Sequence, residues 1–75
     1  MAKATRFSRL TFGRAIRHER ENLGLSQEDF AERANVHRTY ISSIELGKVS
    51  VGIEVANALA AGLGLKLSEL VRRSE

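Results

Sequence analysis

The chain has 75 residues, of which 43% are hydrophobic and 28% are charged, and its formal net charge is +3. These values are typical of one small globular domain. The absence of cysteine excludes disulfides and cysteine-type zinc sites. No apolar run approaches the roughly 18 residues of a membrane helix, and no secretory signal opens the chain. We therefore expect a cytoplasmic protein, without membrane contact, whose mild basic excess permits an anionic partner.

Residues 1–10 contain three basic residues and no acidic one. We interpret them as a basic N-terminal extension whose first residues are disordered, because chain termini are often poorly ordered. The remainder, residues 11–75, reads as a single domain without repeats or linkers. Any nucleic-acid contact by Lys3, Arg6 or Arg9 would involve the DNA backbone.

Apolar residues at helical spacing predict a first helix from about Ser8 or Thr11 to Leu23, with Phe12, Ile16 and Leu23 near one face. Gly13 weakens its first turn by roughly 1 kcal/mol relative to alanine. Gly24 is well placed to end this helix in the left-handed conformation.

The stretch 26–46 predicts two short helices separated by the turn 34–36. Ser26 caps the first of them. Asn35 stands where a left-handed residue makes the turn, and asparagine tolerates that conformation. His37 occupies the N-cap position of the second helix, which spans about 37–46 and ends at Gly47.

Two further helices complete an all-α domain. The fourth is expected at about 53–63, with a core stripe that comprises Ile53, Ala56, Leu59, Ala60 and Leu63. The last covers about 67–73. Five helices with short connections and no strand signal indicate an all-α fold.

The run from Phe12 to Leu70 resembles the Cro/C1-type (XRE-like) helix-turn-helix regulators. The resemblance rests on Gly24-Leu25-Ser26-Gln27 followed by Ile41-Ser42-x-Ile44-Glu45-x-Gly47-Lys48. It implies a five-helix, lambda-repressor-like DNA-binding domain with its helix-turn-helix at about 26–46. The segment from His37 to Ser42 is also similar to the recognition helix of restriction–modification controller proteins. Asn35 departs from the glycine that this family usually has at the turn.

In such a domain the first residues of the recognition helix reach base edges in the major groove. Arg38 can donate two hydrogen bonds to guanine, and Thr39 offers a hydroxyl and a methyl group, the latter suited to thymine. Ser43 lies one turn after Thr39. We therefore expect these three residues to contact bases, although each could also be an ordinary solvated side chain.

Five further residues are candidates for phosphate contacts: Gln27, His37, Tyr40, Ser42 and Lys48. Tyr40 could equally be half-buried core with its hydroxyl outward, and Lys48 could be plain surface. The resemblance also implies a structural salt bridge between Arg20 and Glu45. Neither histidine has a partner at metal or catalytic-triad spacing, and no phosphate-binding loop is present. We expect no enzyme activity, no cofactor and no metal.

A single domain of this kind reads too few base pairs for high specificity, so we expect a homodimer on double-stranded DNA. The apolar residues available for an interface are Leu46, Val49, Val51, Leu67, Leu70 and Val71, and we assign the last five of these to it. Leu67 and Leu70 could instead belong to the core.

Two other functions share this sequence pattern. An antitoxin would bind a toxin protein and autoregulate its operon with the same fold. A helical bundle that only binds proteins would not use Arg38 to contact DNA. The favoured hypothesis is a dimeric transcriptional regulator of a pseudo-palindromic operator.

Overall fold

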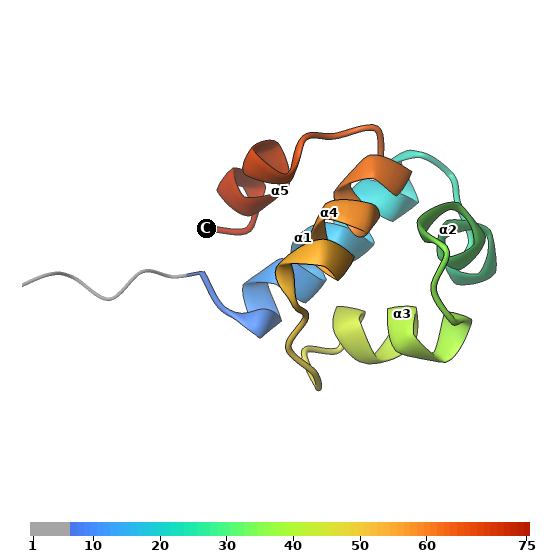
Figure 1. Cartoon of the computed structure of the whole chain (residues 1–75), viewed down its shortest axis with the longest axis horizontal. Coiled ribbons are helices and arrows are strands. Elements are labelled where there is room, and N and C mark those ends of the chain that lie inside the picture. The colour runs from blue at the N-terminus through green and yellow to red at the C-terminus, as the bar shows by residue number, and fades with distance from the viewer. Residues whose placement is uncertain (1–6) are drawn as a thin grey trace, which may run out of the picture.

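Five α-helices joined by short connections make up the computed structural model, which describes residues 7–75 (Figure 1). They are α1 (Arg9–Asn22), α2 (Gln27–Ala34), α3 (Arg38–Glu45), α4 (Ile53–Gly62) and α5 (Leu67–Arg73). No strand occurs within the described residues, and the predicted all-α fold is confirmed. Because α1 begins at Arg9, the helical domain starts before the predicted boundary at residue 11. Lys3 and Arg6 of the predicted extension lie outside the described residues.

Helix ends coincide with the capping signals of the sequence. The Ser26 hydroxyl accepts a hydrogen bond from the backbone nitrogen of Asp29 at 2.9 Å, as expected for an N-cap. Ser8 caps α1 through the backbone nitrogen of Thr11. Gly24 follows α1 with φ +70°, a conformation in which glycine has no steric penalty. The predicted cap at Ser26 and the stop at Gly24 are therefore confirmed.

The core draws on all five helices. Its fully buried large apolar side chains are Ile16, Phe30, Ile41, Ile44, Leu59 and Leu70. Removal of such side chains from water is the main favourable contribution to folding. The prediction that Ile53 and Leu23 face the core is wrong. Ile53 is 75% exposed, and Leu23 is also exposed. Both stand at helix ends, where the chain leaves the packed layer and the apolar stripe no longer faces the core.

Gly13 allows α1 and α3 to approach closely. A Cβ atom at this position would overlap the carbonyl oxygen of Ile44 and lie 3.0 Å from the carbonyl oxygen of Glu45. No side chain larger than hydrogen fits there without a shift of backbone. The glycine that weakens the first turn of α1 is therefore required by the packing of α3.

The arrangement leaves one side of α3 free of other helices. α3 packs against α1 and α2, whereas α5 packs against α1 and α4. In Figure 1, α1 and α4 lie in the centre, α3 runs along the lower edge and α5 lies on the opposite side. The scaffold thus presents α3 at the surface.

Candidate DNA-binding surface

One left-handed residue closes the turn between α2 and α3. Asn35 has φ 57° and ψ 44°, as predicted, and no other non-glycine residue in the range 7–75 has a positive φ. The Val36 backbone N–H then donates to the carbonyl oxygen of Ala31 at 3.0 Å. Val36 also packs against the core. These contacts fix the angle at which α3 leaves α2.

α3 is amphipathic, with its apolar side chains inside and its polar ones outside. Ile41 and Ile44 are buried. Arg38 and Thr39, in the first turn, are exposed, whereas Ser43 is half-buried. The structure therefore brings the three predicted base-contact residues together on one helix, with the first turn as its most accessible part.

The predicted phosphate-contact residues surround this face. His37 and Lys48 are exposed at the two ends of α3, and Ser42 is half-buried on it. Tyr40 is half-buried and packs against the core, as the alternative interpretation of this residue expected. Gln27 opens α2, next to α3. All five positions lie on or beside the helix-turn-helix.

His37 caps α3 with its imidazole ring. Its Nδ1 atom lies 3.2 Å from the backbone nitrogen of Thr39 and 2.7 Å from the hydroxyl oxygen of the same residue. A backbone N–H can only donate, so Nδ1 accepts. The predicted N-cap position is confirmed. The contact with the Thr39 side chain was not predicted, because it depends on the ring orientation at a helix end.

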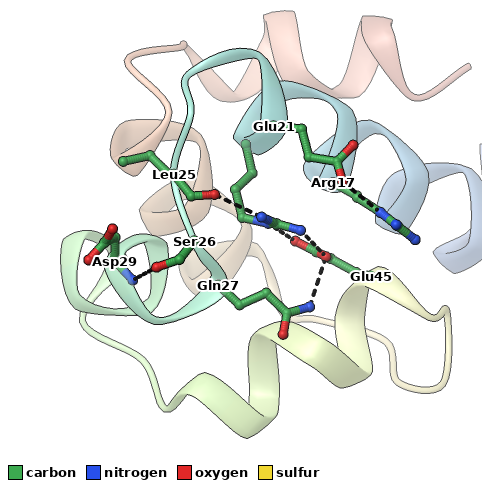
Figure 2. A network of polar contacts seen from close by, with 8 residues as sticks. Arg17, Glu21, Leu25, Ser26, Gln27, Asp29 and Glu45 are labelled. Atoms are coloured by element: carbon green, nitrogen blue, oxygen red, sulfur yellow. Dashed lines mark hydrogen bonds and ion pairs between the residues drawn. The ribbon is translucent and has the colours of Figure 1, made fainter.

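A buried ion pair joins Arg20 of α1 to Glu45 of α3, and Figure 2 shows the polar contacts around Glu45. Arg20 Nε donates to Glu45 Oε2 at 2.6 Å and Arg20 Nη2 donates to Glu45 Oε1 at 3.0 Å. The two side chains are only 10% and 3% exposed. Arg20 Nη1 also donates to the Leu25 carbonyl oxygen at 2.8 Å, in the connection before α2. The structural salt bridge that the resemblance implied is confirmed.

The same pair perturbs the protonation of the arginine. The hydrogen bond from Arg20 to Glu45 raises the pKa of the Arg20 guanidinium above its ordinary value. Burial acts in the opposite direction, and the negative charges of Glu45 and Glu21 add to the rise. Arg20 is therefore held as a cation, with Glu45 as its counter-ion.

Gln27 connects this buried pair to the surface beside α3 (Figure 2). Its Nε2 atom donates to Glu45 Oε1 at 3.1 Å. No sequence pattern predicted this contact, because residues 27 and 45 come together only through the crossing of α2 and α3. An amide nitrogen carries two hydrogens, so the bond to Glu45 leaves the second for another acceptor.

The domain also has an apolar groove of about 440 Å³, and no residue of α3 lines it. Val49, Val51, Leu67 and Val71, four of the predicted interface residues, line it. Four further apolar residues, which were not predicted to form an interface, also line it: Phe7, Phe12, Ile53 and Ala56. Phe7 and Ile53 stand out as interface candidates because they are large, apolar and exposed. The sequence did not predict this exposure, because apolar periodicity does not indicate which side chains near a helix end are exposed.

The assignment of Leu70 to an interface is wrong. Its side chain is completely buried within the chain and belongs to the core cluster. α5 packs this leucine against the other helices, so no surface remains for a second copy to contact. The core alternative for Leu70 is the correct one.

Neither a metal-binding cluster nor a membrane-spanning helix occurs among residues 7–75. No three side chains of the His, Cys, Asp and Glu types gather there in a way that could hold a metal ion. Among the five helices of this region, none has the length and apolar character needed to cross a membrane.

Fold and surface together define a helix-turn-helix DNA-binding domain. A family model described as "Helix-turn-helix" matches residues 16–70, and the chain belongs to this family. The match includes α2, the turn at Asn35 and α3 in full. The sequence resemblance to Cro/C1-type regulators is confirmed.

Several similar proteins are described as control or controller proteins. Control protein C.MunI of a Mycoplasma species is 44% identical over 63 residues, which cover 83% of this chain and 85% of that protein. The structure of the restriction-modification controller protein C.AhdI from Aeromonas hydrophila superposes with a TM-score of 0.80 at 32% identity, over 83% of this chain and 94% of that one. C.Esp1396I, solved as a tetramer in complex with its natural 35 base-pair operator, has a TM-score of 0.74 at 28% identity, over 96% and 97% of the chains.

These findings define the general activity. The chain is a DNA-binding transcriptional regulator of the helix-turn-helix family and not an enzyme.

Proposed function

We propose that the chain binds a pseudo-palindromic operator as a homodimer, with α3 of each copy in the major groove. The observation that carries this proposal is the exposure of Arg38 and Thr39 at the start of a helix that the Asn35 turn holds at the surface. Helix-turn-helix proteins read base edges with this part of the second helix. We propose that the protein acts in the cytoplasm, with double-stranded DNA as its partner.

Arg38 is the principal base-reading residue of the proposal. Its guanidinium is exposed and can donate to O6 and N7 of one guanine, a contact typically worth about 1–3 kcal/mol of discrimination. Thr39 meets the neighbouring base with its hydroxyl and methyl groups. Ser43 contributes at the far end of the face, where it is half-buried.

Phosphate contacts from both ends of α3 hold the helix in register. Gln27 offers the second hydrogen of its amide, while the first remains on Glu45. His37 offers Nε2, which carries the ring hydrogen of a neutral imidazole when Nδ1 accepts. Lys48 supplies a charge just after Gly47. Tyr40 and Ser42, which lie between His37 and Lys48 in the chain, complete the proposed set of phosphate contacts.

The apolar groove is the proposed dimer interface. Val49 and Val51 come from the loop after α3, and Leu67 and Val71 come from α5. Two copies that cover this groove bury apolar surface that a monomer leaves in water. The same loop follows the recognition helix directly, so pairing here would fix the spacing between the two α3 helices.

The named relatives favour a controller over an antitoxin. C.MunI and C.AhdI are both described as control or controller proteins. We propose by analogy that this chain regulates genes of a restriction–modification system. An antitoxin would need a separate surface that binds its toxin, and we assign no surface of this chain to that role.

Selection of bound sites from random DNA, followed by footprinting, tests the proposal. The expected product is an inverted repeat whose half-site centres lie about 34–36 Å apart, one turn of DNA. Binding should weaken steeply with salt, because each phosphate contact releases counter-ions. Enrichment of no sequence over random DNA at low salt would overturn the proposal.

A further inference from the structure

His37 and Thr39 form a hydrogen-bonded pair at the start of α3 with a defined direction. Because the backbone N–H of Thr39 donates to His37 Nδ1 at 3.2 Å, this ring nitrogen carries no hydrogen. The Thr39 hydroxyl oxygen lies 2.7 Å from the same nitrogen. Without a hydrogen between them, the lone pairs of His37 Nδ1 and the Thr39 oxygen would repel at this distance. The Thr39 hydroxyl therefore donates its hydrogen to the ring nitrogen.

A hydroxyl has one hydrogen and two lone pairs. With its hydrogen committed to His37, the Thr39 oxygen can only accept a hydrogen bond from DNA. In the major groove the base donors are the N6 amino group of adenine and the N4 amino group of cytosine. Guanine O6 and N7 and thymine O4 are acceptors and would face the lone pairs of Thr39.

We infer that His37 is a specificity-determining positioning residue, which sets Thr39 as an acceptor and so selects adenine or cytosine at the base that Thr39 faces. This inference rests on the proposed contact between Thr39 and a base. His37 touches no base in this scheme. It acts through the orientation of one hydroxyl, in addition to its role as the cap of α3 and its proposed phosphate contact through Nε2.

Two substitutions at residue 37 test these roles, and the pattern of affinity over different operators distinguishes orientation from capping. His37→Leu removes the acceptor and the cap together. His37→Asn supplies a carbonyl oxygen that can accept from both the backbone and the hydroxyl of Thr39, and asparagine is a strong N-cap. Loss of the cap alone should weaken binding to all operators equally. Loss of orientation should change preference only at the base that Thr39 faces.

The first measurement needs no DNA. Long-range proton–nitrogen correlation spectra of the free protein, in mildly alkaline buffer, report which ring nitrogen of His37 carries hydrogen. We expect hydrogen on Nε2 and none on Nδ1. Hydrogen on Nδ1 would overturn the inference, because Thr39 would then be free to donate to a base.

The second measurement uses operators obtained by selection with the wild-type protein. Thr39→Val removes the hydroxyl and keeps the shape, so the position at which its preference changes marks the base that Thr39 faces. We expect adenine or cytosine there. An analogue without the exocyclic amino group (purine for adenine, pyrimidin-2-one for cytosine) should lower wild-type affinity about 3- to 10-fold, the usual effect of one hydrogen bond, and leave Thr39→Val unchanged.

The variants at residue 37 complete the test. His37→Leu should lose the 3- to 10-fold sensitivity of affinity to the base analogue, whereas His37→Asn should keep it. In the Thr39→Val background, His37→Leu should cause no further change in this sensitivity. Retention of the sensitivity by His37→Leu would overturn the role of His37 and leave the proposed function intact. Failure of wild-type protein to select any operator would overturn both.

Discussion

Arg20 and Glu45 form a two-point ion pair in the interior, between the first and third helices of the domain. The Nε and Nη2 atoms of Arg20 donate to the two carboxylate oxygens of Glu45 at 2.6 and 3.0 Å. Glu45 also accepts from Gln27 at 3.1 Å. The last residue of α3 is therefore held by α1 and by the first residue of α2, and the pair fixes the position of α3.

Removal of one partner of this pair should be costly. Arg20→Met leaves the Glu45 carboxylate buried without its cation, a change that typically destabilises a protein by about 3–5 kcal/mol. We expect a loss of this size in the free energy of unfolding, measured by urea denaturation. Arg20→Met/Glu45→Leu, which removes both charges, should recover much of the loss, because apolar replacements of a buried pair are often neutral.

The exposed pair of Arg17 and Glu21 provides the matched control. Arg17 Nε and Glu21 Oε2 lie 3.1 Å apart, with the side chains 61% and 54% exposed. Arg17→Met should change the free energy of unfolding by about 0.5 kcal/mol or less. A similar cost for Arg17→Met and Arg20→Met would show that the burial of the ion pair is not the source of the effect.

Gly13 should resist replacement by alanine although it lies within a helix. Helix propensity alone predicts a gain of roughly 1 kcal/mol for Gly13→Ala. The added Cβ would meet the Ile44 carbonyl oxygen, and overpacking typically costs about 1–3 kcal/mol. We expect a net loss in thermal and urea stability. Gly52→Ser, at an N-cap with open space around its Cβ, should have no such cost; a more stable Gly13→Ala protein would contradict the close approach of α1 and α3.

Much of the fold follows from local signals that need no tertiary information. Ser26, Gly24 and Asn35 have the predicted roles in the structure because caps and left-handed turns depend on residues a few positions apart. Ile53 could not be placed in the same way. Its exposure depends on where the loop before α4 meets the body of the domain, and periodicity does not encode that.

The candidate DNA-binding surface was likewise predictable only in part. The outward position of Arg38 and Thr39 follows from helical geometry, and the Arg20–Glu45 pair followed from the family resemblance. The bond between Gln27 and Glu45 and the orientation of His37 were not predicted. Both depend on side-chain rotamers at a crossing or a helix end, which a sequence pattern does not determine.

Arg38→Ala should weaken specific binding far more than non-specific binding. Loss of a bidentate contact with guanine is expected to cost about 1–3 kcal/mol per half-site and to relax the base preference at that position. Fluorescence anisotropy on the selected operator and on scrambled DNA measures the two affinities. Arg14→Ala removes the same charge from an exposed position on α1, near the C-terminus. Equal effects of the two variants would refute a base contact by Arg38.

Substitution in the apolar groove should separate dimerisation from folding. Val71 lines the groove and is only half-buried in the single chain. In a two-fold interface each substitution acts twice, so Val71→Gln should raise the dimer dissociation constant at least about tenfold, equivalent to 1.4 kcal/mol. Sedimentation equilibrium measures this, and circular dichroism should show an unchanged helix content. Leu23→Gln, at an exposed leucine outside the groove, should leave the dimer intact. A dimer insensitive to Val71→Gln would place the interface elsewhere, and a monomeric wild-type protein at micromolar concentration would contradict the proposed homodimer.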